Sequence, residues 1–241
     1  ELVKERTQGR INVRVAGAEQ LGNEQSLLTS LRTGAVDMTV NSQGSTSALL
    51  PELAALGLPF LFNDSAAAFK VLDGPIGAEL DQRFAKIGMV PLGWWDNGIR
   101  HITNSKRPIV KPADLKGLKI RTPPDPNIAS SKIFEVDKYI SLSAHKWECS
   151  PFLMSQITWA RLPAADRDVI KAAAKEAGDL QRKLFLDTEV KLAADFKANP
   201  KIEINQADQA AFREASASVV DAWKAKPFGD FVDRLSKTAR V

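Results

Sequence analysis

The chain of 241 residues carries 33 basic and 29 acidic side chains, which gives a formal net charge of +4 at pH 7. Apolar residues make up 44% of it, enough to bury a core in one large domain or in two small ones. Basic and acidic residues are interleaved, as in residues 176–183, and this pattern is typical of a hydrated surface rather than of a nucleic-acid-binding face. We therefore expect no nucleic acid among the partners.

Side chains suited to catalysis or metal binding are scarce. The single cysteine, Cys149, excludes an internal disulfide, and the two histidines, His101 and His145, are too far apart for a zinc-protease spacing. Isolated histidines are more often structural than catalytic. A nucleophilic Cys149 would need a base beside it, and a strand would hold the nearby His145 well apart. We predict no enzymatic activity, no metal site and no cofactor.

Membrane and targeting segments are not evident in the sequence. No apolar run approaches the roughly 20 residues that a membrane-spanning helix requires. The chain opens at Glu1 inside a helical pattern and shows no signal peptide, which we interpret as a start trimmed by processing, cloning or disorder.

The first forty or so residues predict a strand, a helix and a second strand. Residues 11–15 alternate apolar and polar side chains, Gly22 or Asn23 caps a helix over 24–33, and residues 36–40 form the next strand. This unit is too long for a hairpin, so it favours a parallel crossover. The following patterns predict a buried irregular segment, two helices and three strands, over residues 49–62, 64–72, 75–86, 89–95, 99–103 and 118–124.

The longest helical pattern begins at Pro163 and runs to about Asn199, interrupted by Gly178 alone. A helix of this length spans roughly 50 Å, more than one small domain, so we expect it to brace two lobes. A strand over 201–205 and a helix over 208–224 follow.

Five stretches of the chain resemble, in the same order, the solute receptors of TRAP (tripartite ATP-independent periplasmic) transporters of the dicarboxylate-receptor (DctP) type. They are residues 9–38, 58–80, 93–124, 132–145 and 162–185. The resemblance implies a two-lobed α/β periplasmic-binding-protein fold, similar to class II, with crossing hinge strands, a long helix along both lobes and a ligand in the cleft. The lobes would be residues 1–97 plus 149–188 and residues 98–148 plus 189–241.

The resemblance also implies a location and partners. It implies a monomeric receptor in the bacterial periplasm that binds a small organic acid, such as a dicarboxylate or a sugar acid. Delivery would be to the membrane subunits of a TRAP transporter.

One segment of the family pattern is absent. The family runs through a helix, a strand and a Gln-Glu-Asn-Pro segment after the position of Pro126, whereas here Asn127 follows at once. About forty residues are missing, more than a βαβ crossover needs at minimum. We expect them to be unresolved with the numbering closed over the gap, because a true deletion would expose an apolar core face of the second lobe.

Arg121 is the main candidate for binding the acid. It follows the apolar residues 118–120 at the carboxyl end of a predicted strand, where ligands of open α/β sheets bind. Its guanidinium matches a carboxylate with two parallel hydrogen bonds. By the resemblance, Arg121 falls on the arginine with which the family clamps its ligand's carboxylate.

A second group of candidates surrounds the predicted crossing strand at Gly98. The resemblance suggests that Arg100 contacts or supports the same anion, although an arginine paired with a local acid is nearly as plausible. One of Trp94 and Trp95 should face the core and the other the cleft, and we choose Trp95 for the ligand. Asp96 could accept a hydrogen bond from a ligand hydroxyl.

A third group lies in the first lobe. Glu24 opens a predicted helix, where it either complements the helix dipole or contacts the ligand. Asn41 and Ser42 follow the predicted strand 36–40 at its carboxyl end, and the resemblance places Ser42 and Glu24 on ligand-contacting positions.

Two other interpretations stay open. Transcription regulators with such an effector-binding half and enzymes such as lyases or hydrolases share this architecture. A helix-turn-helix segment ahead of Glu1 would favour the first, and the shortage of histidine argues against the second.

Overall fold

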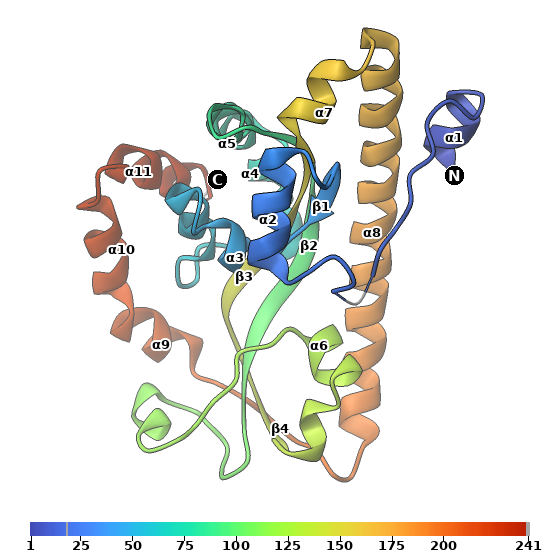
Figure 1. Ribbon diagram of the computed structural model, residues 1–241. Helices are drawn as coiled ribbons and strands as arrows, with labels where there is room; N and C mark the ends of the chain where they lie inside the picture. Colours follow the sequence, from blue (N-terminus) through green and yellow to red (C-terminus); the bar gives the residue numbers. More distant parts are fainter. Residues whose placement is uncertain (18, 240–241) are drawn as a thin grey trace. The chain divides into compact units, whose positions relative to one another are not determined.

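The computed structural model describes residues 1–17 and 19–239, and the chain falls into two compact units (Figure 1). Unit 1 comprises Glu1–Leu53, Leu72–Trp95 and Cys149–Arg182. Unit 2 comprises Ala54–Val71, Asp96–Glu148 and the chain from Lys183 onward. The chain therefore passes between the units several times, as a discontinuous two-lobed protein requires. The exact lobe boundaries expected from the sequence stay a prediction.

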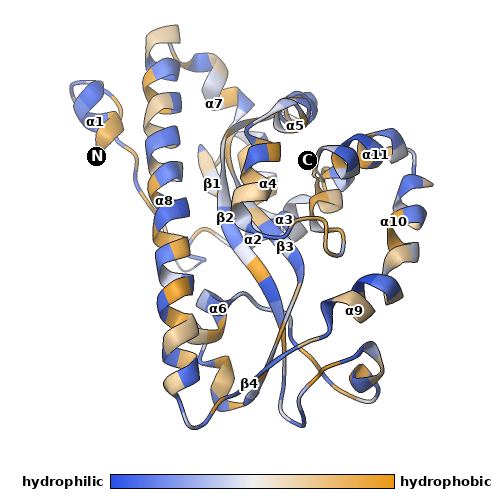
Figure 2. Cartoon of the chain, turned by 180° about the vertical axis from the view of Figure 1, so that it is seen from behind, coloured by the Kyte–Doolittle hydropathy of each residue, from blue (hydrophilic) through white to orange (hydrophobic). Residues whose placement is uncertain are grey.

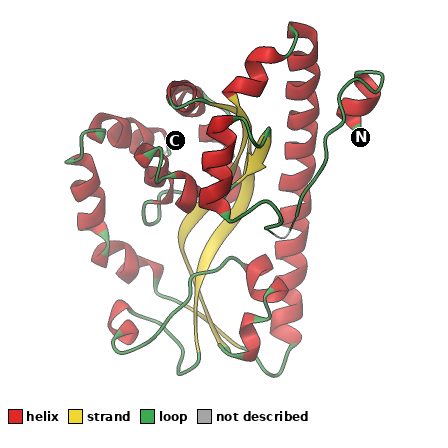
Figure 3. Ribbon diagram, in the orientation of Figure 1, coloured by secondary structure: helices red, strands yellow, loops and turns green. Residues whose placement is uncertain are grey.

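The strands form one mixed sheet in the order β1-β3-β2, with β4 also paired to β3 (Figure 3). Their bounds are Met38–Val40 for β1, Met89–Asn104 for β2, Tyr139–Ser155 for β3 and Glu203–Gln206 for β4. β1 runs antiparallel to β3 in unit 1, and β4 runs parallel to β3 in unit 2. The predicted α/β class is confirmed.

The predicted parallel crossover at the start of the chain is wrong. Residues 11–15 form no strand, and Val13 and Val15 are exposed, because the segment has no neighbouring strand among the described residues. The strand that does form, β1, pairs antiparallel with β3, so that Met38 lies opposite Met154. Alternation alone predicts an extended segment but cannot supply its partner.

Two predicted strands merge into one. β2 includes both 89–95 and 99–103, and Gly98, at φ +78, lies within it. The predicted strand over 118–124, by contrast, is reduced to an isolated bridge between Arg121 and Thr103. No further strand is described beside it, so the segment pairs on one side only.

Unit 1 packs helices against its part of the sheet. The helices are α1 (Leu2–Arg6), α2 (Glu24–Thr33), α3 (Gln43–Thr46), α5 (Pro75–Lys86), α7 (Gln156–Arg161) and the first part of α8 (Ala164–Ala198). Asn23 caps α2 by accepting a hydrogen bond from the Ser26 amide, and Gly34 ends it in the left-handed conformation. The buried cluster of Leu92, Met154 and Ile170 joins β2 and β3 to α8.

Two of the hydrophobic clusters formed by the described residues lie in unit 2. Ile102, Ile109 and Phe212 belong to one, and Ile140 and Phe196 to the other. Its helices are most of α4 (Ser65–Leu72), α6 (Asp125–Ser130), the second part of α8, α9 (Gln209–Ala215), α10 (Ala217–Lys224) and α11 (Gly229–Thr238). Short 3-10 helices cover Pro112–Leu115 and Ile133–Glu135, and a third one, Pro51–Gly57, begins in unit 1 and ends in unit 2. The helix predicted over 208–224 is thus divided at Ser216 into α9 and α10.

The long helix predicted from Pro163 is confirmed as α8, which has 35 residues. Figure 2 shows hydrophobic and hydrophilic residues alternating along it. Not every hydrophobic residue of α8 is buried, since Leu180, Leu184, Leu186 and Val190 are exposed. No helix in the described part of the chain combines the length and apolarity that would let it span a membrane.

The chain is continuous where the family pattern is interrupted. Pro126 and Asn127 both lie in α6, which Pro124 caps. The expectation of unresolved residues at this point is therefore wrong, and the segment is absent from this sequence itself.

Candidate functional site

Arg121 presents its guanidinium without a protein partner. Its backbone exchanges two hydrogen bonds with Thr103 of β2, of 2.9 and 3.0 Å, which fix its position in unit 2. The side chain is exposed and makes no hydrogen bond or ion pair with residues 1–17 or 19–239. A planar cation held on a fixed backbone and left unpaired is suited to bind a carboxylate.

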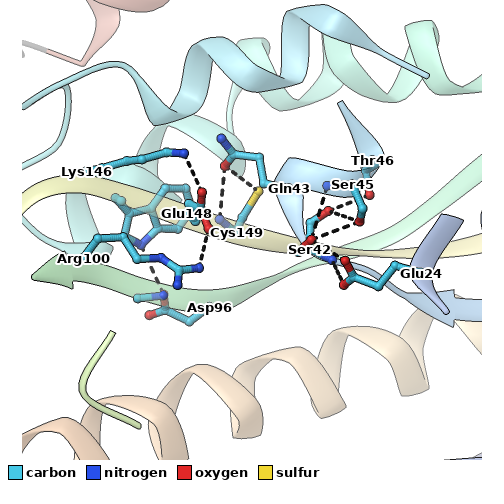
Figure 4. A network of polar contacts seen from close by, with 12 residues as sticks. Glu24, Ser42, Gln43, Ser45, Thr46, Asp96, Arg100, Lys146, Glu148 and Cys149 are labelled. Atoms are coloured by element: carbon cyan, nitrogen blue, oxygen red, sulfur yellow. Dashed lines mark hydrogen bonds and ion pairs between the residues drawn. The ribbon is translucent and has the colours of Figure 1, made fainter. Parts of the chain in front are cut away.

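Arg100 lies in a different environment, since it is already paired. Its guanidinium donates to the carboxylate of Glu148 on β3, and Lys146 contacts the other oxygen of the same carboxylate at 2.5 Å (Figure 4). The side chains of Arg100 and Glu148 are only 11% and 14% exposed. The Nε atom of Arg100 is buried with no acceptor among the described residues. Arg100 is thus a mostly buried cation with unused hydrogen-bonding capacity.

Burial and the ion pair act in opposite directions on Arg100. Burial lowers the pKa of its guanidinium, and the charge and hydrogen bond of Glu148 partly offset that decrease. An arginine remains protonated throughout the physiological range. Arg100 therefore stays positively charged.

The two histidines are half-buried near this pair in unit 2 and are neutral at pH 7. Burial lowers the pKa of His101 to about 4, and burial together with the neighbouring His101, Lys146 and Arg100 lowers the pKa of His145 to about 4. Nδ1 of His101 accepts a hydrogen bond from the Ala144 amide at 3.2 Å. Both side chains therefore fit the structural role that isolated histidines usually have.

Asp96 is engaged by the protein itself. Its carboxylate accepts hydrogen bonds from the Gly98 amide at 2.9 Å and from the Trp147 indole at 3.1 Å, and the residue is 5% exposed. Glu189 of α8 is close enough for the negative charge of Asp96 to affect its pKa. Burial and then the charges of Asp96 and Asp125 raise the pKa of Glu189 to about 7.

Trp95 packs inside unit 1. Its ring lies 5.3 Å from that of Phe152, and its indole nitrogen lies 3.5 Å from the position that a Cβ on Gly178 would occupy. That nitrogen is buried and finds no acceptor in the described part of the chain. The neighbouring Trp94 is 4% exposed and contacts Phe84. Both rings therefore contribute to packing, and a ligand contact by Trp95 stays a prediction.

Glu24, Asn41 and Ser42 are brought together in unit 1, at the first turn of α2 and the start of α3. The Glu24 carboxylate accepts hydrogen bonds of 2.7 Å from both the amide and the hydroxyl of Ser42 (Figure 4). The Asn41 side chain donates to the backbone oxygen of Glu24 at 2.8 Å. Burial would raise the pKa of Glu24, but the Ser42 hydrogen bonds outweigh it and the pKa is lowered. Glu24 is therefore an ionised, exposed acceptor.

Three further polar residues lie next to these candidates, and of these the sequence reasoning missed Lys146. Gln43, which is 1% exposed, accepts from the Cys149 amide at 3.2 Å. Glu148 pairs with both Arg100 and Lys146, as described above. The spacing of Lys146 and Glu148 was a usable signal, because residues two apart on a strand share a face. No cluster of His, Cys, Asp and Glu suited to a metal ion occurs in residues 1–17 and 19–239.

A family model matches the chain in two stretches. The model describes bacterial extracellular solute-binding proteins of family 7 (DctP), and it matches residues 1–128 and 124–226. The two stretches meet where α6 runs through Pro126 and Asn127. The break supports the absence of an internal family segment at this point.

Two related proteins extend the comparison. The y4mM protein of Sinorhizobium fredii is 52% identical over 260 residues, covering 92% of this chain and 48% of that protein. The 2,3-diketo-L-gulonate-binding periplasmic protein YiaO of Escherichia coli is 31% identical, covering 91% of this chain and 79% of that one. The alignment with y4mM is longer than the 241 residues of this chain, so y4mM contains residues that this chain lacks. The chain spans about half of the length of y4mM.

A solved structure shares the fold. It is a TRAP periplasmic solute-binding protein from Sulfitobacter sp. with bound β-D-galacturonate, 27% identical, with a TM-score of 0.91 over 99% of this chain and 92% of that one. Such neighbours have the two-lobed fold and are binding proteins, not enzymes.

Proposed function

Because the chain belongs to the bacterial extracellular solute-binding proteins of family 7, we propose that it is a periplasmic receptor for a small organic acid. It would deliver the acid to the membrane subunits of a TRAP transporter. YiaO is named for binding 2,3-diketo-L-gulonate, and the Sulfitobacter protein holds galacturonate. Both ligands are sugar acids with one carboxylate, so a sugar acid is the first class to test.

The observation that carries this proposal is the free guanidinium of Arg121. An exposed arginine without a protein partner contributes little to folding, whereas a bidentate pair with a ligand carboxylate would use both its charge and its shape. Lysine would supply the charge without the planar pair of donors. Arg121 is therefore proposed as the carboxylate-binding residue.

The remaining predicted residues are assigned to the rest of the ligand. Arg100 would bind the acid group together with Arg121. Glu24, Asn41 and Ser42 form one polar group in unit 1, and Glu24 and Ser42 would contact hydroxyl groups of a sugar acid. Asp96 would accept from a further ligand hydroxyl, and Trp95 would pack against the carbon skeleton. Closure of the receptor around the acid would favour the bound state because the charged hydrogen bonds are then shielded from water.

A thermal-shift and calorimetry screen tests the proposed function. The panel is D-galacturonate, D-glucuronate, D-galactonate, 2,3-diketo-L-gulonate, succinate and pyruvate, with D-galactose as the neutral control. A ligand that binds only the native state raises the unfolding temperature. At a free ligand concentration of about 100 times Kd, it adds about 2.7 kcal/mol to the free energy of unfolding. We expect at least one acid to stabilise the protein and D-galactose to have no effect. Absence of stabilisation by every acid would contradict an organic-acid receptor.

Replacing Arg121 with lysine tests its assigned role. We expect Arg121→Lys to weaken binding of the best panel acid at least tenfold, about 1.4 kcal/mol, because a bidentate pair is lost. The unfolding temperature of the ligand-free protein should not change, since the side chain has no described partner. Arg32→Lys is the matched control, an exposed arginine of α2 for which we expect neither effect. Equal affinity of the Arg121→Lys variant and the wild type would exclude Arg121 as the clamp.

A further inference from the structure

We propose that Glu148 is a positioning residue that serves as a resident counter-anion on Arg100, and that the acid ligand binds this arginine by taking the place of Glu148. The inference rests on the proposed function, since it concerns how the same acid reaches one of its binding groups. It adds a role for two residues, Glu148 and Lys146, which would set how strongly the receptor holds an anion.

The contacts of Glu148 show that its carboxylate is shared. One oxygen accepts from Arg100, and the other contacts Lys146 Nζ at 2.5 Å (Figure 4). Lys146 and Glu148 lie two residues apart on β3, so their side chains start on the same face of the strand. A carboxylate that loses Arg100 would therefore keep a cation beside it.

The hydrogen bonding of Arg100 is incomplete in this state. Glu148 engages a terminal nitrogen of the guanidinium, and the buried Nε has no acceptor among the described residues. A buried donor without an acceptor costs free energy relative to a bidentate arrangement. A ligand carboxylate that engages the guanidinium side-on would satisfy both nitrogens.

The balance of charges keeps the free-energy cost of replacing Glu148 by the ligand small. Arg100 and Lys146 carry two positive charges against the single negative charge of Glu148, and the adjacent His101 and His145 are neutral. If an anion binds Arg100, Glu148 stays paired with Lys146 and no charge is left buried alone. Without Glu148, Arg100 would be a mostly buried cation with no paired anion, which is costly in the free receptor but favourable for an incoming acid.

Calorimetric titration of single variants with the best panel acid tests the inference. Glu148→Gln removes the competing charge and keeps the shape, so we expect binding to tighten about tenfold. In Lys146→Met, Arg100 is the only cation left to pair with Glu148. Displacement of Glu148 would then leave its charge unpaired, so we expect the acid to bind severalfold more weakly. Glu148→Asp restores the charge and should return the affinity toward that of the wild type.

Glu203→Gln is the matched control, because Glu203 forms an exposed pair with Lys138 of the same strand at 3.2 Å. We expect it to leave affinity unchanged. If Glu148 only stabilises the fold, Glu148→Gln will lower the unfolding temperature and bind the acid equally or more weakly, and this result would overturn the inference while leaving the proposed function intact. If the wild type binds no panel acid, both proposals fail together.

Discussion

Arginine side chains of identical charge have different uses in unit 2 because their surroundings differ. Arg121 is exposed with no described partner, whereas Arg100 is mostly buried against Glu148. The sequence predicted the position of Arg121 after a strand-like segment, and it left open whether Arg100 binds a ligand or a local acid. The structure provides the local acid, and the two possibilities become compatible if a ligand displaces it.

The half-buried carboxyl of Glu189 should make the free energy of unfolding depend on pH. Burial and the charges of Asp96 and Asp125 raise its pKa to about 7, above the unfolded value near 4.5. Glu189 therefore contributes stability below pH 4.5, and this contribution is lost as the pH rises through 7. We expect Glu189→Gln to match the wild type at pH 5 and to be more stable at pH 8, by about 1–2 kcal/mol after discounting for solvent screening.

Urea unfolding at the two pH values measures this difference. Glu214→Gln on α9 is the matched control, because Glu214 is exposed. The Glu214→Gln substitution should change the free energy of unfolding by the same amount at pH 5 and at pH 8. A Glu189→Gln variant whose advantage does not grow with pH would show that Glu189 is ionised in the folded protein well below neutral pH.

Whether an element could be predicted depended on whether its stability comes from its own residues. The helix α8 was predicted nearly to its ends because its apolar periodicity and its Pro163 start are local signals. The strand predicted over 11–15 failed because a strand also needs a partner, and none is described beside it. The segment of Arg121 does have a partner, but it pairs with β2 only through the bridge to Thr103, which is too short to form a strand. The same distinction holds for the candidate site. The arginines could be predicted from local sequence patterns, whereas the pairing of Glu148 with Arg100 depends on β3 lying beside β2.

Gly98 is the position in β2 where a side chain should be least tolerated. Its φ of +78 disfavours other residues, and an added Cβ would lie 2.8 Å from Phe185 Cε1 and 3.0 Å from Glu189 Oε1. We expect Gly98→Ala to destabilise the protein by about 2–4 kcal/mol, from backbone strain and crowding together. Urea denaturation gives the value.

A second glycine separates the two causes. Gly117 has φ +77, and a Cβ there meets nothing within 4 Å. Gly117→Ala should therefore show the backbone contribution alone, about 1 kcal/mol. Equal losses for the two variants would mean that Phe185 and Glu189 move aside without cost.

At the scale of the whole molecule, the missing family segment changes what unit 2 contains. The family model breaks at the junction within α6, and the y4mM alignment is longer than this chain. The chain nevertheless continues through Pro126 and Asn127 as a helix, and Ile128 of that helix is fully buried in a unit 2 cluster. The residues that remain thus form a core of their own.

The two units should unfold together, because β2, β3 and α8 each pass from one into the other. Neither unit can lose these elements without breaking elements of its neighbour.

Hydrogen–deuterium exchange with mass spectrometry across a urea series can follow residues 24–33 in unit 1 and residues 209–224 in unit 2. We expect their midpoints to coincide, and residues 11–15, which have no strand partner, to exchange before the transition. Midpoints separated by about 1 M would show two independent units. Addition of the bound acid should raise both midpoints equally, because ligand stabilisation is shared by every part that unfolds in the same transition.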